Sequence, residues 1–104
     1  MAGNKKSLNV QPHSNEAELA VLGSMLSSKE AVSKSIQWLK PEDFYKEAHN
    51  KIFTAMRILF DKAEPIDTLS VSEYLKKSNE LDLVGGIYFL TGLVEMVPLS
   101  LIHI

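Results

Sequence analysis

The sequence predicts an all-α domain, a compact orthogonal bundle of about six short helices. Apolar residues recur three and four positions apart through most of the chain, which is the period of an amphipathic helix. No segment shows the apolar and polar alternation that is typical of a half-buried strand. Prolines and a glycine pair divide the chain into segments of helical length. With 104 residues, 45% of them hydrophobic and 23% charged, one compact domain is expected.

The first 13 residues are polar and lack helical periodicity, so residues 1–13 are expected to form a flexible arm, with the domain spanning residues 14–100. The chain has no cysteine, which excludes disulfides and thiolate metal sites. No apolar run approaches the ~20 residues that a membrane-spanning helix needs. A soluble domain of an intracellular compartment is therefore expected.

The first predicted helix begins in "SNEAELAVLGSML". Asn15 is expected to cap it, with Glu18 reaching back to complete a capping box. Gly23 lies inside the helix, where it costs about 1 kcal/mol relative to alanine, and is expected to let a neighbouring helix approach closely. The apolar residues at helical spacing are Leu19, Leu22 and Leu26, flanked by Val21 and Met25.

A second helix, with Val32, Ile36 and Leu39 in register, is expected to stop near Lys40, because Pro41 disfavours helical geometry in the residue before it. Pro41 then suits the first turn of a short helical segment, "PEDF". The acidic residues of this segment, Glu42 and Asp43, lie at the positive end of its dipole.

The third long helix is predicted over residues 46–62. Its core side is expected to carry Ala48, His49, Ile52, Phe53, Ala55, Met56, Leu59 and Phe60. A neutral His49 is expected to bond a backbone carbonyl at the edge of the core. Phe44 and Tyr45 are expected to fill the core, with the hydroxyl of Tyr45 near the surface.

A small metal or acid/base enzyme using Asp43, Glu47 and His49 is one alternative function. Glu47 and His49 are two positions apart on a helix and point away from each other, which excludes a metal site shared by that pair. No catalytic and no metal-binding residue is therefore assigned.

After a turn at Pro65, Ser70 and Glu73 are expected to form a second capping box ahead of a short helix carrying Val71, Tyr74 and Leu75. "NELDLVGG" is expected to be a loop or a single turn, in which Gly85 and Gly86 permit unusual backbone angles. The glycine segments lack the spacing of a Walker phosphate loop, so no nucleotide cofactor is expected in this chain.

The last helix, "GIYFLTGLVEMV", is expected to end at Pro98 and carries two apolar stripes. The predicted inward stripe is Ile87, Leu90, Val94 and Val97. Phe89 lies on the adjoining stripe and is expected to be partly exposed, as part of a docking surface. The alternative is a central, deeply buried helix.

The balance of 11 basic and 13 acidic residues gives a net charge of −2, which argues against a domain that mainly grips a phosphate backbone. A helix-turn-helix DNA-binding module remains an alternative, with residues 46–62 as its recognition helix. The basic residues of that helix are split between faces roughly 140° apart. A protein partner is therefore the better expectation.

Several segments together carry a family resemblance: "NEAELAVLGSML", "LKPEDFYKEAHNKIFTAM", "EPID", "EYL", and "GGIYFLTGL" followed by "VP". Over about Leu8 to Ser100 the chain resembles the N-terminal domain of bacterial replicative DNA helicases of the DnaB type. The resemblance implies a non-catalytic collar domain of a hexameric ATP-driven helicase in the bacterial cytoplasm. It implies self-association in the ring and docking of the C-terminal domain of primase, and leaves room for a helicase loader. DNA is not expected to bind this domain directly. ATP and Mg²⁺ are expected in a separate motor domain.

The chain departs from the family pattern after "VP". Leu101 to Ile104 are expected to be a truncation tail or residues foreign to the domain. Within the matched part, Glu16 and Phe89 are the candidate partner-binding residues. Glu16 lies in the first turn of the first helix, where the dipole favours an acid and exposure is expected.

Overall fold

The computed structural model describes residues 14–96. The predicted arm, the predicted tail, and the roles expected of Val97 and Pro98 lie outside the described residues. The described part contains six α-helices, one 3-10 helix and no strand, which confirms the all-α prediction. The elements are α2 (Asn15–Ser27), α3 (Lys29–Trp38), η1 (Pro41–Asp43), α4 (Glu47–Asp61), α5 (Thr68–Lys77), α6 (Leu81–Val84) and α7 (Gly86–Glu95).

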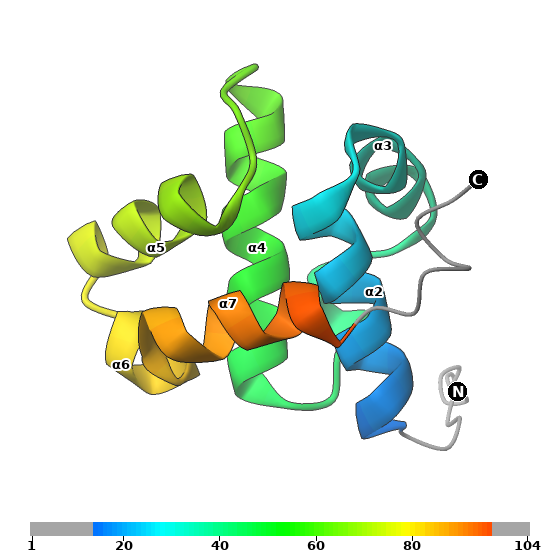
Figure 1. Ribbon diagram of the computed structural model, residues 1–104. Helices are drawn as coiled ribbons and strands as arrows, with labels where there is room; N and C mark the ends of the chain where they lie inside the picture. The colour runs from blue at the N-terminus through cyan, green and yellow to red at the C-terminus, as the bar shows by residue number, and fades with distance from the viewer. Residues whose placement is uncertain (1–13, 97–104) are drawn as a thin grey trace.

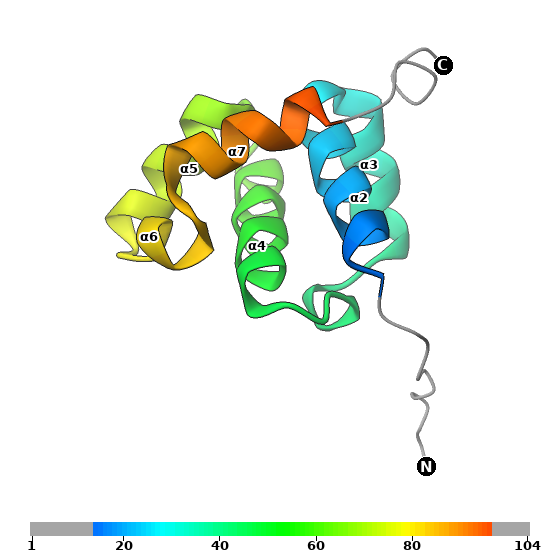
Figure 2. The same ribbon diagram turned by 60° about the horizontal axis from the view of Figure 1, so that its bottom comes forward.

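Helix α4 is the axis of the bundle. Figures 1 and 2 show α2 and α3 on one side of it, and α5 and α6 on the other, with α7 running across from α6 to α2. Helix α7 contacts α5 and α6 near its start and also packs against α2. The last described helix thereby closes the bundle against the first.

The core lies where α2, α4, α5 and α7 meet. Its largest fully buried side chains are Leu22, Met25, Ile52, Phe53, Met56, Val71, Leu75, Leu90 and Leu93. These residues confirm the predicted apolar faces of α2, α4 and α5. Phe44 also belongs to the core, and its ring centroid lies 4.8 Å from that of Phe53. His49 and Ser72 are the buried polar residues of the described part.

The helix caps differ from the two that were predicted. Ser14, not Asn15, caps α2, and its hydroxyl accepts the backbone N–H of Ala17 at 3.1 Å. Glu18 does not reach back to the cap. In α5 the cap is Asp67, which forms the capping box with Ser70, so the predicted Ser70 and Glu73 box is wrong. Both helices begin earlier than predicted because an earlier side chain takes the cap.

Four aromatic side chains of the described part lie in exposed positions, among them Tyr88 of α7. Tyr45 was expected in the core but is 68% exposed, because the chain turns it outward just before α4. Phe60 was placed on the core side of α4 but lies at its edge, 40% exposed. Trp38, at the end of α3, is 76% exposed.

The stripe predicted to face inward on α7 is confirmed for Leu90 and wrong for Ile87 and Val94. Leu90 and Leu93 are buried, whereas Ile87 and Val94 are exposed. Phe89 is half-buried and packs against the core. The helix is apolar on nearly every side, so the sequence contains no polar face that would mark its orientation. Its exposed residues also exclude the deeply buried alternative.

Left-handed backbone occurs at one glycine pair and after two helices, at Ala63 after α4 and at Asn79 after α5. Gly85 and Gly86 have φ of 110° and 78° and join α6 to α7, as their predicted freedom allows. At the end of α4, Ala63 has φ of 57°, and its N–H bonds the Phe60 carbonyl at 2.9 Å. Such a turn satisfies carbonyls that the helix end would leave unpaired.

Candidate functional site

The carboxylate of Glu18, which is partly buried with its side chain 11% exposed, joins α2 to the start of α4. Oε1 of Glu18 accepts a hydrogen bond from Nδ1 of His49 at 2.7 Å, and Oε2 accepts the backbone N–H of Tyr45 at 2.8 Å. His49 is only 2% exposed, so its predicted structural position is confirmed. Its predicted partner, a backbone carbonyl, is wrong. One oxygen bonds a side chain of α4 and the other bonds the backbone just before α4. The carboxylate therefore fixes α2 and α4 relative to each other.

Phe89 of α7 lies next to this pair. Its ring stacks on the His49 imidazole, with centroids 6.3 Å apart and planes 11° apart. The backbone of Gly85 approaches the other part of the same side chain: a Cβ added there would lie 2.9 Å from Cβ of Phe89. Phe89 is therefore held between an imidazole that Glu18 orients and a glycine that leaves it room.

A groove opens beside Phe89, where the starts of α2 and α4 meet α6 and α7. We call it the Phe89 groove; its volume is about 420 Å³. Its lining residues are Asn15, Leu19, Lys46, Glu47, Ala48, His49, Asp82, Leu83, Val84, Gly85 and Phe89. An adjoining hollow of about 250 Å³, formed by Asn15, Glu18, Tyr45 and Lys46, shares Asn15 and Lys46 with the groove.

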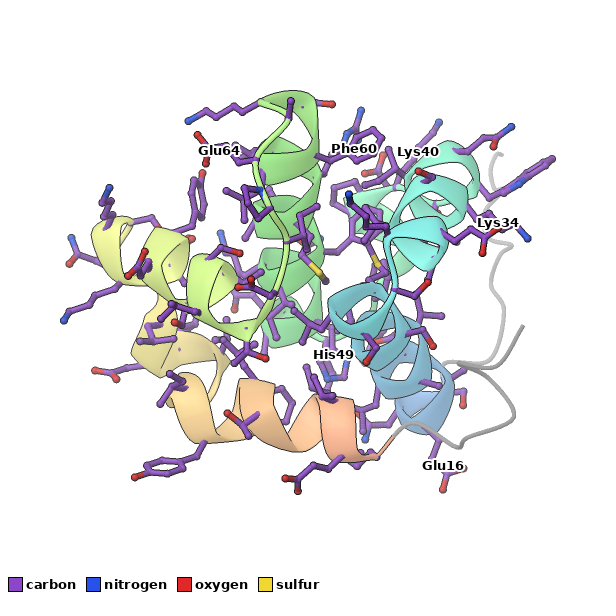
Figure 3. The ribbon with its side chains drawn as sticks, turned by 45° about the horizontal axis from the view of Figure 1, so that its top comes forward. Glu16, Lys34, Lys40, His49, Phe60 and Glu64 are labelled. Carbon is purple, nitrogen blue, oxygen red and sulfur yellow. The ribbon has the colours of Figure 1, made fainter. Side chains whose placement is uncertain are left out.

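The rim of the Phe89 groove is acidic on balance. Two carboxylates, Glu47 and Asp82, line it, compared with one lysine, Lys46. Glu16 does not line it, but it is exposed, follows Asn15 directly and precedes Leu19 by one helical turn. Figure 3 shows the Glu16 carboxylate directed outward from the first turn of α2. Of the two predicted partner-binding residues, Phe89 lies in the wall of the groove, and Glu16 lies outside its lining, on the first turn of α2 next to Asn15.

An ion pair joins α4 to the residue before α6, a helix that contributes to the lining of the groove. Nζ of Lys51, on α4, lies 3.1 Å from Oε2 of Glu80, the residue that precedes α6. The hydrogen bond from Lys51 lowers the pKa of the Glu80 carboxyl below its ordinary value, against the opposing effect of desolvation. The pair is partly exposed and therefore modest in energy.

The residues of the alternative enzyme do not converge. Asp43 accepts the backbone N–H of Lys40 at 2.8 Å, while His49 is occupied by Glu18. Between residues 14 and 96, no three His, Asp or Glu side chains form a group that could hold a metal ion. The same part of the chain has no helix long and apolar enough to span a membrane.

Sequence reasoning missed most of the groove. Lys46, Asp82 and Leu83 come from separate elements and meet only in the folded chain. One signal was available: Glu18 and His49 are polar residues on otherwise apolar helix faces, and such residues need a partner when buried. The identity of that partner, 31 positions away, was not visible.

Comparison with known proteins identifies the family. The family model described as the DnaB-like helicase N-terminal domain matches residues 10–104. The chain belongs to this family. A curated relative, the replicative DNA helicase DnaB of Geobacillus stearothermophilus, is 42% identical over 89 residues, which cover 86% of this chain and 20% of the relative. The replicative DNA helicase DnaC of Bacillus subtilis is 40% identical over 87 residues, covering 84% of this chain and 19% of the relative.

The fold agrees with the DnaB family as well. The crystal structure of the N-terminal domain of DnaB helicase from Mycobacterium tuberculosis matches with a TM-score of 0.81 and 37% identity, over 84% of this chain and 63% of that one. The resemblance stated from the sequence is confirmed. The chain spans about a fifth of the length of the curated DnaB relatives, and corresponds to their N-terminal domain and not to the motor domain.

Proposed function

We propose that this chain is the non-catalytic collar domain of a hexameric, ATP-dependent replicative DNA helicase, and that its Phe89 groove docks the C-terminal domain of primase. Family membership supports the helicase part of the proposal. The observation that carries the docking part is the position of Phe89 in the wall of a groove whose rim is acidic on balance.

The chemistry of the groove defines the partner that fits it. Leu19, Leu83 and Phe89 offer apolar contact area in a concave surface, which suits aliphatic or aromatic side chains of a helix. Glu47 and Asp82 add negative charge beside that area, and Glu16 adds an exposed carboxylate on the first turn of α2. A basic amphipathic surface on primase would complement both features, with the rim charges setting orientation and association rate.

The test is a calorimetric titration of the domain with the C-terminal domain of the cognate primase. Replacing Phe89 with alanine is expected to weaken binding by about tenfold or more, equivalent to ~1.4 kcal/mol. Glu16→Ala and Asp82→Lys are expected to weaken it less, and more strongly at low salt.

Matched controls of the same chemical type come from outside the groove. Tyr88→Ala removes a neighbouring aromatic that is 89% exposed and does not line the groove. Glu30→Ala removes an exposed acid from the first turn of α3. Both controls should bind as the wild type does. Wild-type affinity in Phe89→Ala and Glu16→Ala together would refute the site, and thermal melts would separate lost binding from lost folding.

Catalysis belongs, under this proposal, to the motor domain of the parent helicase, where ATP and Mg²⁺ bind. The collar contributes docking, together with contacts between neighbouring copies that support the ring, and it does not bind DNA directly. The purified chain is expected neither to hydrolyse ATP nor to unwind DNA. Turnover that is lost on mutation within this chain would contradict the assignment, as would steeply salt-dependent duplex binding.

A further inference from the structure

A second groove lies away from the Phe89 groove and shares no residue with it. It runs between the first half of α3 and the turn that follows α4, with a volume of about 610 Å³. We call it the α3 groove. Its lining residues are Lys29, Val32, Ser33, Phe60, Ala63, Glu64, Pro65 and Ile66. Figure 3 shows Phe60 and Glu64 at the opposite end of the molecule from Glu16. The two grooves therefore open on different parts of the surface.

The floor of the α3 groove is apolar and partly open. Val32 is buried beneath it, while Phe60 remains 40% exposed at the end of α4 and points toward α3 in Figure 3. Pro65 and Ile66 continue the apolar surface along the turn. A half-exposed aromatic ring in a concave, apolar setting is suited to receive a bulky apolar side chain.

The turn that forms one wall is closed by short backbone bonds. The N–H of Ala63 donates to the Phe60 carbonyl and that of Glu64 to the Leu59 carbonyl, both at 2.9 Å. Pro65 fixes its own φ and restricts the backbone of the residue before it. A wall that is already ordered costs a ligand little conformational entropy on binding.

The two walls carry opposite charges. Lys29 lies on the α3 wall and Glu64 on the turn, and both are exposed. In the described part of the chain the ion pairs are His49 with Glu18 and Lys51 with Glu80, so neither Lys29 nor Glu64 is neutralised by a neighbour there. Lys29 is also the first residue of α3, where the helix dipole favours an anion. The α3 wall therefore favours an acidic group and the turn a basic one.

We propose that the α3 groove binds an extended segment of a partner protein, anchored by one bulky apolar side chain. An acidic residue on one side of that anchor faces Lys29, and a basic residue on the other side faces Glu64. An extended chain suits this site because its side chains project at regular intervals, so that one segment can present both charges and the anchor. The proposal is independent of primase docking, since no residue of the Phe89 groove takes part.

The test uses four synthetic peptides with blocked ends, titrated into isotope-labelled protein while amide shifts are recorded. The mixed peptide is Glu-Ser-Trp-Ser-Lys; the others replace both charged ends with Glu, both with Lys, or the central Trp with Gly. Wild-type protein is expected to bind the mixed peptide best, by roughly twofold to fivefold over the like-charged ones, the range of exposed ion pairs. The peptide with central Gly should cause no shift. The design does not depend on the direction in which the peptide lies.

Charge reversals on the protein should change the preference predictably. Lys29→Glu is expected to favour the peptide with two Lys ends, and Glu64→Lys the peptide with two Glu ends. Lys34→Glu, on α3 but outside the groove, should keep the wild-type preference. Amide shifts should fall on residues of the α3 groove. The proposal would be overturned if all variants kept the same order of preference, or if the amide shifts fell on residues outside the α3 groove. It would also be overturned if no peptide caused a shift at millimolar concentration. Shifts that depend on protein concentration, showing that a second copy of the chain covers the groove, would overturn it as well.

Discussion

At the scale of single residues, the pair of Glu18 and His49 explains how a polar group is accommodated within the core. His49 lies on the same face of α4 as Phe53 and Met56, as the helical wheel predicts. Its environment could not be read from local sequence, because the carboxylate that satisfies it comes from another helix. Local patterns identify a buried polar residue but not its distant partner.

A double-mutant cycle tests this pair. Glu18→Ala and His49→Ala are each expected to lower the free energy of unfolding by about 1 to 3 kcal/mol, because the first leaves the buried imidazole without its partner and the second removes a buried ring together with its hydrogen bond to Glu18. Their effects should not add, and the coupling energy is expected to be about 1 kcal/mol or more. Urea denaturation of the four proteins measures it. Additive effects would mean that the hydrogen bond contributes nothing in solution, and Glu16→Ala serves as the exposed control.

The ion pair of Lys51 and Glu80 should give a pH-dependent stability. Its folded pKa is lowered, so Glu80 contributes stability that is fully present above the ordinary pKa of a glutamate. This contribution is lost as the pH falls through the lowered pKa of the folded state. Lys51→Gln should therefore cost about 0.2 to 1 kcal/mol at neutral pH and low salt, and almost nothing in strong acid or roughly 1 M salt. Lys62→Gln is the control, and an equal cost at every pH would contradict the assignment.

At the scale of elements, the sequence predicts the helices well and their caps poorly. Pro41 and the glycine pair mark breaks through local backbone geometry, and apolar spacing marks the buried faces. Caps depend on which of several adjacent polar residues the chain uses, so Ser14 and Asp67 were each missed by a few positions. The orientation of α7 was missed because its apolar residues surround the helix.

The junction of α6 and α7 offers a paired prediction. Gly85→Ala is expected to cost about 1 to 3 kcal/mol, because φ of 110° is strained for alanine and the added methyl would meet Phe89. Gly92→Ala, in the middle of α7, meets open space and should stabilise the protein by up to about 1 kcal/mol. Thermal melts of both variants check this. Equal effects would show that the glycines are interchangeable and that the close approach has no energetic role.

At the scale of the whole molecule, both grooves arise where elements distant in sequence meet. The Phe89 groove takes residues from α2, α4, α6 and α7, and the α3 groove from α3 and the turn after α4. Sequence reasoning named Phe89 as a candidate, but no local pattern could show that it shares a groove with Leu19 and Asp82. Relative helix placement follows from core packing, which single-sequence periodicity does not specify.

The packing of α7 against α2 predicts cooperative unfolding. Leu90→Ala, at a fully buried position, should cost about 2 to 5 kcal/mol. If α7 closes a single core, amide exchange should accelerate in α2 and α4 by the same free energy as in α7. Faster exchange confined to α7 would instead identify that helix as a separately unfolding unit.

Because Trp38 is exposed, its intrinsic fluorescence can report on binding at the end of α3. It is the single tryptophan of the sequence, and its indole is already surrounded by water in the folded state. Fluorescence should therefore change little when the protein denatures, so melting curves need circular dichroism. A partner that covers the end of α3 would remove water from the ring and shift its emission to shorter wavelength without any label. Ligands confined to either groove, neither of which Trp38 lines, should leave the emission unchanged.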